Sequence, residues 1–136
     1  MVSRGSVSGE KLPRTYGICQ MKRYSSKSVK GKLDKIVGDL YRSRPSDFSG
    51  LQTNIQWCHL KSRRYLSVRW EPLNNFSLTA GEHLYFTAHP DEFIRWIDKK
   101  YPGRIEELNK IFAQKKEMKK YQLEELLEQK KKDMEG

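Results

Sequence analysis

The sequence Thr-Ala-Gly-Glu at residues 79–82 constrains the fold of this chain more than any other short segment. A threonine followed three residues later by a glutamate is typical of a capping box. The Thr79 hydroxyl accepts the Glu82 amide hydrogen, and the Glu82 carboxylate accepts the Thr79 amide hydrogen. A helix is therefore expected to begin after Thr79. The segment just before it, residues 76–78, is short and extended in character.

Two longer segments upstream of this helix also have the residue pattern of β-strands. Residues 53–60 alternate apolar and polar side chains, and residues 65–70 have the same β character. Residues 71–75 contain one proline and two asparagines, which favour a turn and end the second segment. Residues 53–89 therefore predict a strand, a second strand and a short helix, which together make a ββα unit.

Helical patterns flank this unit on both sides. Residues 28–44 carry one apolar stripe that ends at a proline, and a second helix is expected from His89-Pro90 to Lys100. A last helix begins near Arg104, and beyond residue 112 its apolar pattern thins. We expect an α+β fold with a basic, flexible N-terminal arm at 1–27, a domain built around the ββα unit at 28–112, and a charged, solvated helical tail at 113–136.

Charge indicates an anionic partner. The chain has 27 Lys and Arg against 17 Asp and Glu, for a net charge of +10, and nucleic acid is the commonest partner of such proteins. No apolar run is long enough to span a bilayer and no signal peptide is apparent, so we expect a cytoplasmic protein with no membrane partner. The two cysteines form no C-x-x-C motif, and no disulfide is expected between them in the cytoplasm.

All three histidines lie within residues 55–89, together with two asparagines and a basic cluster. Hydrolysis of a phosphodiester needs a base, a cation to stabilise the phosphate charge, and positive groups that hold the strand. A strand histidine, a loop amide and a helix histidine can converge in a ββα unit. The competing interpretation is that the histidines are structural and the arginines form a solvated face.

Residues 55–70 resemble the signature G-H-F-x-S-R-x-x-L-x-x-R-[WF]-D-x-x-N of the phage NinG/Rap recombination nucleases, an HNH or ββα-metal family. The similarity continues through Gly-Glu-His at 81–83 and His-Pro-Asp-Glu-Phe at 89–93, and covers about residues 29–108. The resemblance implies a central ββα-metal unit and a metal-dependent DNA endonuclease. It further implies single-stranded or branched DNA as substrate, in phage or prophage recombination, with phage or host recombination proteins as further partners. Separately, a second copy of the chain is a candidate partner.

The resemblance also implies roles for individual residues. His59 matches the general base, Asn74 the middle asparagine, with Asn75 as the alternative, and His83 the metal-binding histidine. Arg63, Arg64 and Arg69 match basic positions that contact phosphates. Lys61 belongs to the same basic cluster and is also expected to bind nucleic acid.

The chain departs from the family pattern at the metal positions. Relatives carry cysteine pairs that bind a structural zinc, but here residues 45–50 and the capping box occupy those places, so no structural zinc is expected. Cys58 stands where many HNH units have a metal-binding aspartate. The second ligand for a divalent ion, Mg or Mn with Ni or Zn as alternatives, is therefore either His89 or Cys58. These departures motivate an alternative function, a non-enzymatic DNA-binding or inhibitory protein on a degenerate HNH scaffold. An RNA-binding accessory protein is the third interpretation.

Overall fold

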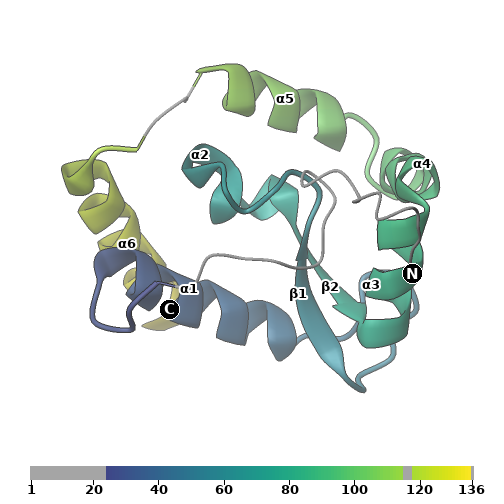
Figure 1. Cartoon of the computed structure of the whole chain (residues 1–136), viewed down its shortest axis with the longest axis horizontal. Helices are drawn as coiled ribbons and strands as arrows, with labels where there is room; N and C mark the ends of the chain where they lie inside the picture. The colour runs from purple at the N-terminus through teal and green to yellow at the C-terminus, as the bar shows by residue number, and fades with distance from the viewer. Residues whose placement is uncertain (1–23, 115–117, 136) are drawn as a thin grey trace, which may run out of the picture.

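The computed structural model describes residues 24–114 and 118–135, in which helices surround a two-stranded sheet (Figure 1). This mixture of helix and sheet confirms the predicted α+β class. The elements follow one another as α1 (Val29–Arg42), β1 (Ile55–His59), α2 (Leu66–Arg69), the 3-10 helix η2 (Pro72–Asn74), β2 (Asn75–Thr79), α3 (Ala80–Ala88), α4 (Pro90–Lys100), α5 (Arg104–Gln114) and α6 (Lys120–Glu135).

The sheet and α3 form a strand–strand–helix unit. β1 and β2 are antiparallel, with Ile55 opposite Thr79 and His59 opposite Asn75. The capping box is confirmed at the start of α3: Glu82 N donates to Thr79 Oγ1 over 3.2 Å, and Thr79 N donates to Glu82 Oε1 over 3.0 Å. The helix therefore begins where the sequence predicted, directly after the second strand.

The strand predicted at residues 65–70 is wrong. Leu66–Arg69 form the single helical turn α2, and the partner of β1 is the short segment that contains Phe76. The apolar residues of the 65–70 segment face two separate cores, since Val68 packs with the sheet and Trp70 packs with α1. A helical turn directs these two side chains apart, whereas a strand would place residues two apart on the same face.

Two hydrophobic cores lie on opposite sides of β1. Neighbouring residues of the strand alternate between them, with Cys58 in the first and Trp57 in the second. The first core, here called the sheet core, joins the sheet to α3, α4 and α5; its most deeply buried members are Val68, Phe76, Leu78, Ile97 and Leu108. The second, here called the α1 core, consists of Leu33, Val37, Tyr41, Trp57, Trp70, Leu123 and Leu127.

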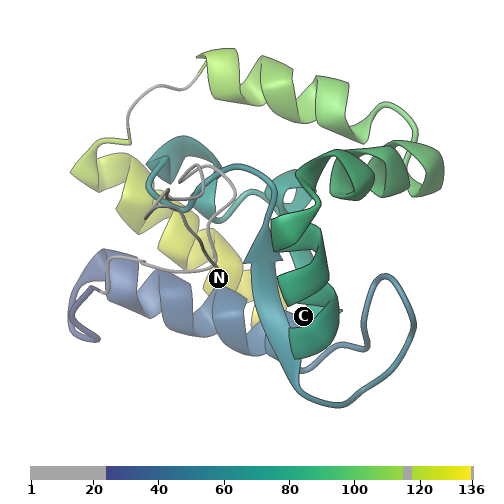
Figure 2. The ribbon, with the colours of Figure 1, turned by 45° about the vertical axis from the view of Figure 1, so that its right-hand side comes forward.

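The expectation that residues 113–136 form a solvated tail is wrong. Leu123 and Leu127 lie one helical turn apart and are only 5% and 6% exposed. Both pack in the α1 core, and Figures 1 and 2 show α6 beside α1. No helix in the described part of the chain is both long and apolar enough to cross a membrane. The predicted basic arm lies mostly outside the described residues, which begin at Tyr24, and stays a prediction.

Gly31 allows a turn to pack tightly against α1. The helix begins after Ser28, whose Oγ accepts the Gly31 amide hydrogen over 3.0 Å. A Cβ atom at Gly31 would lie only 1.9 Å from the carbonyl oxygen of Ser25. That oxygen accepts hydrogen bonds from the amide and hydroxyl of Ser28, so it belongs to the turn that starts the helix. Glycine is therefore needed at position 31 for steric reasons, despite its low helix propensity.

We predict that Gly31→Ala lowers the free energy of unfolding by about 1–3 kcal/mol, because the clash with a backbone carbonyl outweighs the gain in helix propensity. Gly81→Ala is the matched control. It lies in α3 with no atom within 4 Å of the added Cβ, and it should raise stability by about 0.5–1 kcal/mol. Urea unfolding of both variants measures the difference. Equal stabilisation by the two substitutions would show that the turn is not held against α1.

Candidate functional site

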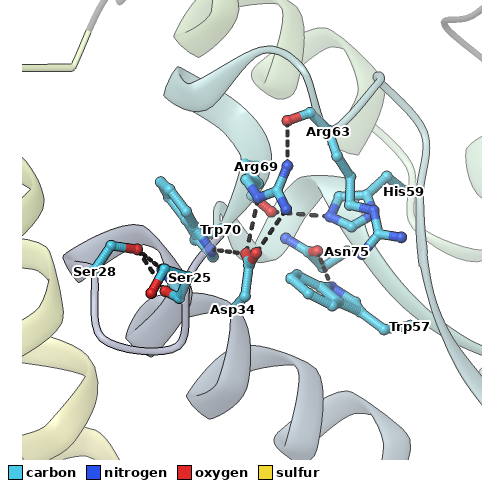
Figure 3. Close-up of polar contacts among 10 residues, drawn as sticks. Ser25, Ser28, Asp34, Trp57, His59, Arg63, Arg69, Trp70 and Asn75 are labelled. Atoms are coloured by element: carbon cyan, nitrogen blue, oxygen red, sulfur yellow. Dashed lines mark hydrogen bonds and ion pairs between the residues drawn. The ribbon is translucent and has the colours of Figure 1, made fainter. Parts of the chain in front are cut away.

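His59, the last residue of β1, is held by a backbone carbonyl. Its Nε2 lies 3.0 Å from the carbonyl oxygen of Arg69 (Figure 3). A carbonyl oxygen only accepts hydrogen bonds, so Nε2 carries the proton and the neutral ring has its lone pair on Nδ1. The ring also packs against Trp57, with ring centres 4.8 Å apart. Burial lowers the pKa of His59 well below its ordinary value, and the positive charge of Arg63 lowers it further.

His83 reaches the same region from α3. Its Nδ1 lies 2.6 Å from the side-chain oxygen Oε1 of Gln56 on β1, so Nδ1 donates and Nε2 carries the lone pair. Burial, and then the charge of Arg63, lower the pKa of His83 to about 4. His83 also contributes to lowering the pKa of His59. Arg63 therefore acts electrostatically on both histidines, and both imidazoles are neutral at pH 7.

Arg63 covers the indole of Trp57, with its guanidinium carbon 4.9 Å from the ring centre. The same indole also contacts the ring of His59. Its Nε1 also donates to the side-chain oxygen of Asn75, which lies opposite His59 in the sheet. Trp57 thus places a cation and an imidazole on one face of β1.

Arg69 does not lie where a phosphate contact requires it. Its side chain is 2% exposed, and its guanidinium forms a two-point ion pair with Asp34 of α1, at 2.8 Å from Nε and 2.7 Å from Nη2. Its Nη1 donates to the carbonyl oxygen of Arg63 over 2.8 Å. Figure 3 shows these contacts converging beside His59. The predicted phosphate contact is corrected on this ground, because the guanidinium is buried and occupied within the protein.

Asn74 is a positioning residue and not a group that touches substrate. The side chain is fully buried. Its Oδ1 accepts the Lys61 amide hydrogen over 2.6 Å, while Nδ2 donates to the carbonyl oxygens of Lys61 and Val68 over 3.1 and 3.0 Å. These bonds hold the loop that follows β1 against α2. The catalytic role predicted for Asn74 is therefore corrected to support of the loop next to His59.

The other predicted residues lie on the surface. Lys61 and Arg64 are both in the loop after β1, and each cation lies over an aromatic ring: Lys61 over Phe112 at 4.7 Å and Arg64 over Tyr65 at 5.4 Å. His89 is exposed at the end of α3, where it stacks on Tyr85 with ring centres 4.2 Å apart. Its Nδ1 lies 2.9 Å from the Tyr85 carbonyl oxygen.

The residues that the structure describes provide only part of the ligand set that a metal ion needs. Within residues 24–114 and 118–135, no three His, Cys, Asp or Glu side chains form a group that could hold one. Cys58 does not fit as a ligand, because it is 2% exposed and burial raises the pKa of its thiol. His83 fits as a single ligand, because its Nε2 lone pair is directed by the bond from Nδ1 to Gln56. Any other ligands would come from substrate or water.

Hydrogen bonds join the two segments in which the family resemblance places zinc ligands. Ser46, in the loop after α1, donates from Oγ to Glu82 Oε1 over 2.5 Å and accepts the amide hydrogens of Phe48 and Ser49. Burial opposes ionisation of Glu82, but the hydrogen bonds from Ser46, Ser49 and Thr79 outweigh it, so the net pKa is lowered. The capping box therefore also connects the loop to the sheet.

Sequence reasoning missed Asp34, Gln56 and Trp57. Asp34 gave a weak signal, as an acid directly beside the apolar stripe of the first helix. Gln56 and Trp57 were assigned only to a strand, and their contacts with the histidines depend on a helix and a loop distant in sequence.

No protein-family model matches the chain, and no curated protein or solved structure is significantly similar to it. Function therefore has to be inferred from the geometry of the site, with the family resemblance of residues 55–93 as a hypothesis.

We predict that Asp34→Asn lowers the free energy of unfolding by about 3 kcal/mol, because it leaves the buried Arg69 guanidinium without a counter-charge. Asp39→Asn on the same helix is the control. Asp39 pairs with Lys35 in solvent, with 53% and 76% of these side chains exposed, and its loss should cost about 0.5 kcal/mol or less. Chemical denaturation of both variants tests this. Similar small losses would show that the Arg69 pair is not structurally important.

We predict that stability depends on pH between 4 and 6.5 because the two site histidines resist protonation in the folded state. The unfolded chain binds protons at His83 below pH 6.5, its ordinary pKa, but the folded chain does so only near pH 4. The free energy of unfolding should therefore fall as pH falls through this range. His83→Gln should flatten the slope, leaving the part due to His59. Equal slopes in both proteins, from urea unfolding across pH, would contradict the burial of His83.

Proposed function

We propose that this chain hydrolyses phosphodiester bonds in DNA, with His59 as the group that accepts the proton from water. The observation that carries the proposal is the bond from His59 Nε2 to the Arg69 carbonyl oxygen, since it holds the ring and leaves the Nδ1 lone pair as the proton acceptor. A structural histidine at this strand end could donate the same bond. What distinguishes His59 is that its partly buried ring lies near an arginine and a second neutral histidine.

In the proposed reaction, His59 Nδ1 takes a proton from water as the water oxygen attacks phosphorus. A new phosphorus–oxygen bond forms, the bond to the leaving oxygen breaks, and that oxygen gains a proton from solvent. Because its pKa is low, His59 is unprotonated and ready to accept at neutral pH, although it is a weaker base for the same reason. Arg63 supplies positive charge that acts on both histidines.

Phosphate binding is assigned to the surface cations of the loop between β1 and α2. Arg63, Lys61 and Arg64 follow one another within four residues of this loop. The net charge of +10 adds a sequence-independent attraction for a polyanion. Arg69 acts differently, since it holds the Arg63 carbonyl oxygen and thereby the shape of the loop.

A divalent ion, when bound, would stabilise charge on the phosphate and on the leaving oxygen. His83 is the residue of this chain that would hold it, and Mg and Mn are the expected ions, with Ni and Zn as alternatives. The choice of DNA, of single-stranded or branched substrates and of a recombination setting rests on the resemblance to the phage NinG/Rap nucleases.

A second candidate is a DNA-binding or inhibitory protein without catalysis. The observation that favours it is the lack of a three-ligand metal group in the described part of the chain, together with the buried thiol of Cys58. The two candidates agree on the basic loop and differ on whether any phosphodiester bond is cleaved.

We predict that His59→Ala reduces the single-turnover rate of DNA cleavage about 100-fold or more, the scale for loss of a general base, while DNA affinity changes little. The wild-type rate due to His59 should be level across neutral pH and fall only under acidic conditions, because burial lowers the pKa of His59 well below 6.5. Plasmid nicking and oligonucleotide cleavage with Mg, Mn, Ni and Zn measure the rate.

His89→Ala is the control histidine variant. The contacts of His89 are with Tyr85, so its predicted role as a metal ligand is not part of this proposal and the variant should keep the wild-type rate. Thermal melts of both variants establish that they are folded. Undiminished cleavage by folded His59→Ala would exclude His59 as the base. DNA binding without cleavage by the wild type, under every metal tested, would support the second candidate.

A further inference from the structure

A pocket of about 280 Å³ opens beside the proposed site, between the loop after β1 and helices α4 and α5. We propose that it holds one unpaired base of the strand whose phosphate lies at His59; this inference rests on the proposed function. The pocket is lined by Leu60, Lys61, Tyr65, Ile94, Ile105, Asn109 and Phe112.

Two aromatic rings and three aliphatic side chains form its walls. Tyr65 and Phe112 meet edge to face, with ring centres 5.0 Å apart and planes at 76°. Both rings are only partly buried, so each keeps surface for a ligand. Planar aromatic groups stack on such surfaces, and every nucleobase has a face suited to this contact.

A cation without an anionic partner lies in the same pocket. The ammonium of Lys61 lies over Phe112, burial lowers its pKa, and no carboxylate of the described residues pairs with it. Arg64 places a second cation over Tyr65. A ligand that stacks on these rings and pairs with these cations is both aromatic and anionic, as a nucleotide is.

One polar group can recognise the edge of a base. The Asn109 side chain lines the pocket, and its amide has no hydrogen-bond partner among the residues that the structure describes. A primary amide both donates and accepts, which suits the paired donors and acceptors on a base edge.

The position of the pocket relates it to the reacting phosphate. Lys61 follows His59 by two residues, so their Cα atoms are at most about 7 Å apart. Asn74 accepts the Lys61 amide hydrogen and donates to the Lys61 carbonyl oxygen, which keeps the pocket wall in place. A base stacked within a duplex cannot enter such a pocket, so the pocket selects single-stranded or locally unpaired nucleic acid.

The test measures binding of bases without requiring cleavage. Thymidine 5′-monophosphate and deoxyribose 5-phosphate are titrated into the full chain while NMR follows the Asn109 side-chain amide. In parallel, a short thymidylate strand, intact or with one abasic site, is titrated into the His59→Ala protein. We expect removal of the base to weaken binding about 10-fold in both series. A base preference for the mononucleotide without one for the strand would assign the pocket to free nucleotides and overturn the inference.

Phe112→Leu should abolish this preference for a base while keeping apolar packing. Tyr121→Leu, which removes an aromatic ring that is 58% exposed on α6, should leave it unchanged. Lys61→Met serves as a second variant and should weaken both ligands alike. Equal binding of nucleotide and sugar phosphate, or an unchanged preference in folded Phe112→Leu, would overturn the inference. A base preference in a protein that never cleaves DNA would overturn the proposed function and leave the pocket assignment intact.

Discussion

The ion pair between Asp34 and Arg69 is the interaction on which the rest of the site depends. It connects α1 to the turn α2 across 35 residues of sequence, and the same carboxylate accepts the indole hydrogen of Trp70 over 2.9 Å. Arg69 then holds the Arg63 carbonyl oxygen with its guanidinium and His59 with its own carbonyl oxygen. A buried ion pair adds little net stability compared with apolar packing, but loss of one partner is costly. Its effect here is to determine the conformation of the loop after β1.

The electrostatics of the site are consistent with the proposed chemistry. Burial and the charge of Arg63 keep His59 and His83 neutral, so each offers a lone pair. Each imidazole has its other nitrogen held, by a backbone carbonyl for His59 and by Gln56 for His83. Lys61 and Arg64 add positive charge on the loop that follows His59. Lys61, which lines the pocket, belongs to this loop, so base and phosphate would be bound by adjacent parts of one loop.

Local sequence patterns predicted a helix boundary correctly where the interaction that forms it joins residues only a few positions apart. The capping box at Thr79 and the proline after the first helix are of this kind, and both boundaries were predicted. The strand predicted at residues 65–70 was wrong because the pattern of apolar residues suits a strand as well as a helical turn. Only the pairing of β1 with β2 shows that no partner strand is left for this segment. The prediction that the last helix is solvated was wrong for a related reason. Its two buried leucines are too few to indicate a core without knowledge of α1.

The sequence by itself determined the basic character of the chain, the α+β class, the start of α3 and the presence of His59 at the end of a strand. Tertiary structure alone decided which basic residues remain on the surface. Arg63, Arg64 and Arg69 are equivalent by composition, yet only Arg69 is buried, because α1 brings Asp34 to it. It also decided that Asn74 supports a loop and that Cys58 is enclosed in the sheet core. Burial and charge pairing arise from contacts between segments distant in sequence, so no local pattern of residues specifies them.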